Sequence, residues 1–339
     1  MQNLVRLKGE KMEILYFLAK LHNPVTDFLF SLITHIGDET VFLVVAIAFF
    51  WCINKREGYY ILITGLLGTL VNQFLKLVCR IPRPWVRDPA FRDKVVPSAF
   101  ERATGYSFPS GHTQNVGGTF GSIGLFTGKK WLRITSIVII VLVSFSRMYL
   151  GVHTPADVGV SLLIAGALVF ILYPLFSDED TFHRAMPILI LISAVLAFGF
   201  LAYVLCVSPD GLDPHNFESA RKNAATLVGC LVGLCVVYPL DRYKINFTTD
   251  GVWYSRVIKL LLGLGIVFAV KSGLSKPLEL LFSLFIKGEY VLVARAVRYF
   301  LIVITAGVIW PLSFGFFAKL RIPFMDKFTL WLKSKFAKS

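Results

Sequence analysis

The sequence predicts an all-α fold: a polytopic integral membrane helical bundle with about nine or ten transmembrane helices. Hydrophobic residues make up 55% of the 339 residues and charged residues only 17%, compared with about 25% in soluble domains. The mean hydropathy is +0.67. The apolar residues come in runs, several of them near the roughly 20 residues that cross a bilayer as a helix. A soluble globular, a disordered and a fibrous protein are therefore excluded.

Nine apolar runs are expected to span the membrane. In chain order they are residues 41–53, 58–78, 111–127, 131–150, 156–176, 186–207, 224–240, 257–270 and 290–314. Another run, residues 278–286, is too short to cross, so it is expected to be interfacial or re-entrant.

The N-terminal part leaves two alternatives open. Residues 12–21 form an amphipathic helix in the membrane interface, or they continue through Asn23-Pro24 into residues 28–36 as a kinked tenth span. The sequence is compatible with both.

Lysines and arginines assign the two sides of the membrane. Because consecutive spans alternate in direction, the loops fall on two faces. One face, with the loops at residues 55–56, 128–130, 178–184 and 241–259 and the C-terminal tail, carries sixteen Lys or Arg with the adjoining Arg133. The other carries five once the loop from residue 76 to 109 is set aside. The positive-inside rule puts the first face in the cytoplasm. The loop at 76–109 is cationic yet faces outward.

No cofactor, metal or nucleic-acid partner is expected. The five cysteines are odd in number and show no metal-ligand spacing, so we interpret them as small buried apolar side chains. The net charge of +14 would suggest nucleic acid in a soluble chain. In a membrane protein, cytoplasmic loops and anionic headgroups account for it, as does a site that handles phosphate.

The first cluster of polar residues joins Lys76 to Arg83-Pro84 at the outer end of a span. If the helix persists to Ile81, Lys76 and Arg80 lie along one helical face together with Arg83. A snorkelling lysine with interfacial arginines is the alternative.

The second cluster, Ser110, Gly111 and His112, opens the next span. A Ser cap, a Gly that lets the backbone approach a ligand, and free N–H groups make an anion site. The alternative is an ordinary N-cap followed by a solvated histidine.

The third cluster contains Arg147, His153 and Asp157. Asp157 lies one helical turn after His153 and is placed to accept a hydrogen bond from its imidazole. The alternative is a capping box in which Asp157 reaches back to Thr154.

The helix count puts all three clusters at the ends of consecutive spans on one side. Two histidines, two arginines and a lysine at one membrane face indicate phosphoryl chemistry, because Arg and Lys bind phosphate oxygens and a neutral imidazole is a nucleophile or proton carrier.

These three clusters resemble the three signature motifs of the type-2 phosphatidic acid phosphatase superfamily, which includes lipid phosphate phosphatases, glucose-6-phosphatase and vanadium haloperoxidases. They match in order and at every signature position. Residues 49–51, 81–84 and 106–112 are also similar to sphingosine-1-phosphate phosphatases, although Gly111 departs from the Ser or Thr that those relatives usually carry. The resemblance implies a six-helix-type phosphatase core. We expect residues 1–178 to be the catalytic membrane core and 179–339 to be accessory transmembrane helices.

The resemblance also implies the role of each residue. His153 attacks phosphorus, Asp157 orients it, and His112 protonates the leaving alkoxide and then activates water. The phosphate oxygens are held by Lys76, Arg83, Ser110, the N–H of Gly111, and Arg147. No metal is required.

The expected function is that of a lipid phosphatase that cleaves a phosphate monoester at the extracytoplasmic face of the cell membrane. The alternatives are a lipid phosphotransferase, an undecaprenyl or isoprenyl diphosphate phosphatase with the same site, and a protein that binds or transports anionic lipids without chemistry. The sequence does not indicate an oligomeric state.

Overall fold

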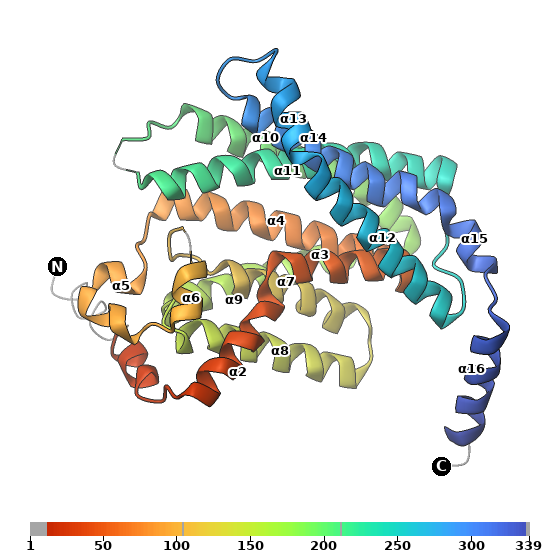
Figure 1. Ribbon diagram of the computed structural model, residues 1–339, viewed down its shortest axis with the longest axis horizontal. Helices are drawn as coiled ribbons and strands as arrows, with labels where there is room; N and C mark the ends of the chain where they lie inside the picture. Colours follow the sequence, from red (N-terminus) through yellow and green to blue (C-terminus); the bar gives the residue numbers. More distant parts are fainter. Residues whose placement is uncertain (1–11, 104, 211, 337–339) are drawn as a thin grey trace. The chain divides into compact units, whose positions relative to one another are not determined.

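The computed structural model describes residues 12–103, 105–210 and 212–336. Within these ranges every regular element is a helix (Figure 1). The all-α prediction is confirmed, and the long apolar helices make the chain an integral membrane protein.

Seven helices in the described part of the chain are long and apolar enough to cross a membrane. An eighth is counted if Pro24–Gly37 and Glu39–Ile53, which are bent by 52°, form one broken span. The expected count of nine or ten is therefore not confirmed. The predicted span at 111–127 corresponds to helix α7 (Gly111–Phe126), which has only 16 residues, nine of them buried inside the protein.

The N-terminal residues form separate helices. Residues 12–19 are helical and the helix then ends. Helix α2 (Pro24–Thr34) starts afresh, because the side chain of Asn23 accepts hydrogen bonds from the N–H groups of Val25 and Thr26. A single kinked helix through Asn23-Pro24 is not formed.

Two compact units make up the chain. Among the described residues, the first unit takes those up to Ala46 and Tyr59–Val228, and the second takes Ile47–Gly58 and the residues from Gly229 onward. This structural boundary falls inside a helix. The expected division of function at residue 178 stays a prediction.

The first unit contains the predicted site. Its further helices are most of α3 (Glu39–Ala48), most of α4 (Lys55–Cys79), α5 (Pro84–Arg87), α6 (Pro97–Arg102), α8 (Lys130–Tyr149), α9 (Pro155–Leu172), α10 (Glu179–Cys206) and the first part of α11 (Pro214–Leu240).

Helix α7 packs against both α8 and α9, and α2 packs against α8 (Figure 1). The α7–α9 contact requires a glycine, because a Cβ on Gly117 would lie 2.8 Å from the Cβ of Ala165. Small residues of this kind let membrane helices approach closely. The start of α7 is thereby held beside the start of α9.

A hydrophobic core anchors the turn between α8 and α9. Its fully or nearly fully buried members include Leu15, Phe91, Tyr149, Leu150 and Val152. Residues from three separate parts of the chain thus fix the turn that carries His153.

The second unit is described by itself. It contains α12 (Trp253–Gly273), α13 (Ser275–Ser283), α14 (Tyr290–Ile304), α15 (Phe314–Lys319) and α16 (Pro323–Phe336). Its core includes Trp51, whose indole N–H donates to the carbonyl of Ala306 at 2.9 Å. Helix α13 holds most of the run predicted to be too short to cross, and it continues α12 in one candidate span, Trp253–Ser283.

Candidate active site

The turn after α8 places His153. The carbonyl of Arg147 accepts from the N–H groups of both Val152 and His153 at 3.2 Å. Gly151 has φ +77°, and a Cβ there would lie 3.1 Å from the Phe91 ring, so this position requires glycine. The side chain of His153 is buried, with only 2% of its surface exposed.

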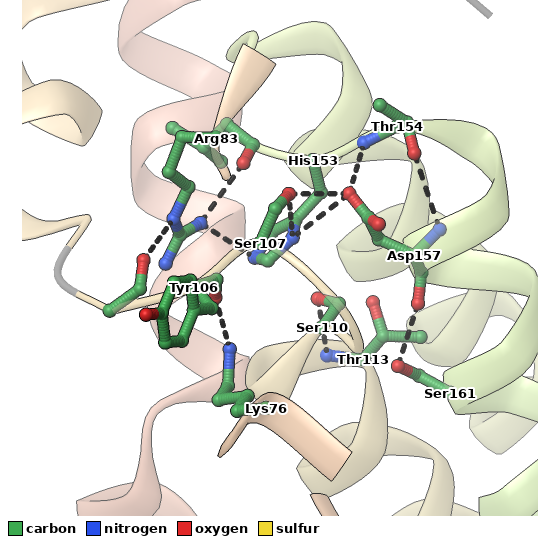
Figure 2. A network of polar contacts seen from close by, with 12 residues as sticks. Lys76, Arg83, Tyr106, Ser107, Ser110, Thr113, His153, Thr154, Asp157 and Ser161 are labelled. Atoms are coloured by element: carbon green, nitrogen blue, oxygen red, sulfur yellow. Dashed lines mark hydrogen bonds and ion pairs between the residues drawn. The ribbon is translucent and has the colours of Figure 1, made fainter. Parts of the chain in front are cut away.

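One ring nitrogen of His153 faces a guanidinium group. The Nη1 atom of Arg83 lies 3.0 Å from Nε2 of His153, as Figure 2 shows. Arg83 also donates from Nε to the carbonyl of Gly105 at 2.9 Å and from Nη1 to that of Val152 at 3.0 Å. Because a guanidinium only donates, Nε2 carries a lone pair. This hydrogen-bond network assigns the proton of the neutral ring to Nδ1.

The other ring nitrogen faces a carboxylate and a hydroxyl. Nδ1 lies 3.6 Å from Oδ2 of Asp157 and 3.5 Å from Oγ of Ser107. Both distances exceed those of ordinary hydrogen bonds. Ser107 instead donates to Oδ2 of Asp157 at 2.5 Å, and the N–H of Thr154 donates to the same oxygen at 2.7 Å (Figure 2). Asp157 therefore closes the capping box and also lies beside His153.

The environment keeps His153 neutral. Burial lowers the pKa of the imidazole well below 6.5, and the positive charge of Arg83 lowers it further. At neutral pH the Nε2 lone pair is thus free of a proton.

Lys76 reaches the same group of loops. Its Nζ donates to the carbonyl of Tyr106 at 2.6 Å (Figure 2), and the next residue, Ser107, donates its N–H to the carbonyl of Ile81 at 2.8 Å. Helix α4 ends at Cys79, not at Ile81, and Arg80 has φ +48°. The loop at 105–107, not a continuous helical face, brings Lys76 and Arg83 together.

Ser110 is the N-cap of α7, as predicted. Its Oγ accepts from the N–H of Thr113 at 3.5 Å, and its own N–H donates to the carbonyl of Asp157 at 3.2 Å. The nearest atom to a Cβ built on Gly111 is Oδ1 of Asn72 at 3.9 Å, so Gly111 lies in a roomy position.

Arg147 is buried, and one of its hydrogen-bond donors has no partner among the described residues. Its Nη1 donates to Oγ1 of Thr34 at 2.6 Å, whereas its Nε has no hydrogen-bond partner among the described residues. A buried unpaired donor is costly, and an oxyanion would satisfy it.

His112 and Arg147 line one cavity of about 600 Å³. The remaining lining residues are mostly polar and come from α2, the segment between α2 and α3, the start of α3, and α6; they include Thr34, His35, Asp38, Glu39, Glu101 and Arg102. The Nε2 atom of His112 lies 2.9 Å from Oδ1 of Asp38.

All eight predicted residues lie in the first unit, and contacts join the three motifs: Arg83 to His153, and Ser110 to Asp157. Sequence reasoning missed Ser107, Asp38 and Thr34. Ser107 belongs to the stretch 106–112, but a lone serine in a loop has no distinguishing pattern. Asp38 and Thr34 precede the motifs by dozens of residues, so no local spacing marks them.

Comparison with known proteins agrees with this arrangement. Residues 56–180 match the model described as "PAP2 superfamily", and residues 225–321 match "PAP2 superfamily phosphatase, transmembrane extension". The first range contains all three motifs.

Three relatives illustrate the similarity. Sphingosine-1-phosphate phosphatase 1 of Mus musculus is 27% identical over 67% of this chain and 50% of its own length. Undecaprenyl-diphosphatase BcrC of Bacillus subtilis is 31% identical over 46% of this chain and 78% of its own length, and phosphatidylglycerophosphatase B of the same organism is 30% identical over 47% and 79%. The chain thus spans about half the length of the sphingosine-1-phosphate phosphatases that it matches. No solved structure matches it significantly.

Proposed function

Because the chain belongs to the PAP2 superfamily, we propose that it hydrolyses a phosphate monoester of a membrane lipid through a phosphohistidine intermediate, without a metal ion. One observation carries the proposal. A buried, neutral imidazole presents the lone pair of its Nε2 to Arg83 at 3.0 Å, so a nucleophile and a phosphate-binding cation already lie together.

In the first step, Nε2 of His153 attacks phosphorus and the bond from phosphorus to the lipid oxygen breaks. His112, in its protonated form, gives its proton to the departing alkoxide, so the lipid leaves as an alcohol. The phosphorylated ring is positively charged, and the adjacent Asp157 stabilises it.

In the second step, a water molecule attacks the phosphohistidine. His112, now neutral, takes one proton from the water as its oxygen bonds to phosphorus and the bond from phosphorus to Nε2 breaks. Inorganic phosphate leaves, and both histidines return to their starting forms.

Positive side chains supply the charge that this transition state needs. The equatorial oxygens gather negative charge, which Lys76, Arg83 and Arg147 balance, with further hydrogen bonds from Ser110 and the N–H of Gly111. The unpaired Nε of the buried Arg147 supports its place in this set.

The proposed substrate is a lipid whose phosphate reaches the outer leaflet while its tail stays in the bilayer. The relatives are named for sphingosine-1-phosphate, undecaprenyl diphosphate and phosphatidylglycerophosphate. These names define the substrates to be compared, including the diphosphate alternative.

Phosphate release by the purified protein tests the proposal. The panel contains phosphatidic acid, phosphatidylglycerophosphate, sphingosine-1-phosphate and undecaprenyl diphosphate, each with EDTA. We expect release from at least one of them. Release from none would favour phosphate transfer or lipid binding.

Two matched variants separate catalysis from folding. His153→Ala is expected to lose turnover by several orders of magnitude, as removal of a nucleophile generally does. His183→Gln is the control, since Nε2 of His183 lies 3.2 Å from Oε1 of Glu179 within α10, outside the three motifs. A protein that only binds or transports lipid would keep its function in both variants.

A further inference from the structure

The segment between α2 and α3 is built onto the first turn of α7. A Cβ on Gly37 would lie 2.9 Å from the Cβ of His112, so only glycine fits there. The carbonyl of Gly37 also accepts a hydrogen bond from Nδ2 of Asn115 at 3.3 Å. Asp38, the next residue, is therefore held beside His112 by its backbone.

The carboxylate of Asp38 bridges two imidazoles. Its Oδ1 lies 2.9 Å from Nε2 of His112, and its Oδ2 lies 2.9 Å from Nδ1 of His35. Nη1 of Arg102 lies 2.6 Å from the same Nδ1 of His35 and 3.0 Å from its Nε2. The contact of Asp38 with His112 is shorter than the 3.6 Å between Asp157 and His153.

This contact decides which nitrogen of His112 can exchange protons with a substrate. A carboxylate only accepts, so Nε2 of His112 carries its proton toward Asp38. In the neutral ring Nδ1 then carries the lone pair and can act as a base, and in the protonated ring it carries the proton that is given to a leaving group. His112 and Asp38 both line the cavity of about 600 Å³, together with Arg147.

We propose that Asp38 is a positioning residue that fixes the tautomer and orientation of His112, so that Nδ1 of His112 acts as the acid in the first step and the base in the second. This inference rests on the proposed phosphatase function and deepens it. A hydrogen-bonded carboxylate plays the same part for other catalytic histidines, where it orients the ring and stabilises the imidazolium.

Asp38→Asn tests the proposal, because it keeps the size of the side chain and removes its charge. A general acid contributes about 10²- to 10⁴-fold, so we expect kcat on the best lipid phosphate monoester to fall by at least about 10-fold, with KM little changed. Asp27→Asn is the matched control: Asp27, on α2, accepts from the hydroxyl of Tyr149 at 2.8 Å, and its loss is expected to leave kcat unchanged.

A second substrate distinguishes a role of Asp38 in proton transfer from a purely structural role. The nitrophenolate of 4-nitrophenyl phosphate leaves without protonation, so its first turnover does not need the acid. Asp38→Asn is expected to release the first equivalent of nitrophenol at the wild-type rate and then to turn over slowly, because the second step still needs the base. Stopped-flow absorbance would show this as a burst.

The outcomes are distinct. An active wild type with an unchanged Asp38→Asn variant, or with first turnovers slowed equally on both substrates, overturns the role of Asp38 and leaves the proposed function standing. A wild type that releases phosphate from neither lipid nor aryl substrate overturns both. Thermal melting of each purified variant shows whether a loss reflects unfolding.

Discussion

The hydroxyl of Ser107 provides the sharpest test of the geometry around His153. It donates to Oδ2 of Asp157 at 2.5 Å, the short distance typical of a hydrogen bond to a charged oxygen. The only other short contact of that oxygen among the described residues comes from the N–H of Thr154 at 2.7 Å. Ser107→Ala removes one of these two contacts and leaves the helix cap intact.

The expected size of the effect follows from these contacts. A hydrogen bond to a charged group contributes about 1.5 to 3 kcal/mol. If this whole energy is lost from the transition state, in which His153 becomes positively charged, kcat falls by about 10- to 150-fold, since each 1.36 kcal/mol is a factor of ten. The phosphate-binding cations are unchanged, so KM is expected to stay within about threefold of the wild-type value.

The assay is steady-state phosphate release from the best lipid substrate, with thermal melting measured in parallel. Ser107→Thr, which keeps the hydroxyl, is expected to recover part of kcat. An unchanged or raised kcat in Ser107→Ala would refute the reasoning, because it would mean that the hydroxyl competes with His153 for Asp157 and does not hold the carboxylate in place.

Gly151→Ala is expected to lower the free energy of unfolding by about 1 to 3 kcal/mol, because φ is +77° and the new Cβ would lie 3.1 Å from Phe91. The control is Gly128→Ala, where φ is +65° and nothing lies within 4 Å of the new Cβ. Unfolding titrations in detergent measure both variants, and their difference gives the cost of the contact with Phe91. Burial lowers the pKa of His153, so the unfolded chain binds a proton that the folded chain does not, and stability should fall as the pH drops below about 6.5. Melting curves of His153→Gln should show a smaller loss of stability at low pH. Equal slopes of melting temperature against pH in the variant and the wild type would contradict this prediction. Phosphate release is expected to be the same with and without EDTA; a loss that Mg²⁺ restores would contradict the metal-free mechanism.

The helical membrane fold could be predicted because it depends on composition. Long apolar runs must form helices in a bilayer, where backbone groups have no water to bond. All but the last residue of the predicted span 186–207 accordingly lies within α10. The expected count of nine or ten helices is not confirmed, and α7 is where the two counts differ. Most of its Gly, Ser, Thr and Gln residues are buried inside the protein, and hydropathy along the chain does not distinguish burial in protein from burial in lipid.

The three motifs could be found because each one is local. Helix ends, caps and a one-turn spacing place Ser110 at the start of α7 and Asp157 one turn into α9, and the structure confirms both caps. Local spacing also predicted that Asp157 would adjoin His153, but it could not show that Ser107 takes the short contact.

The sequence by itself determined the membrane-embedded helical class and the superfamily, and it predicted the candidate site residues, since all of these depend on hydropathy and short spacing. Only the tertiary structure decided which groups hold those residues: Ser107 on Asp157, Thr34 on Arg147 and Asp38 on His112. These contacts join positions dozens of residues apart, with the exact separation set by how helices pack, and one polar side chain in a single sequence carries no sign of its distant partner.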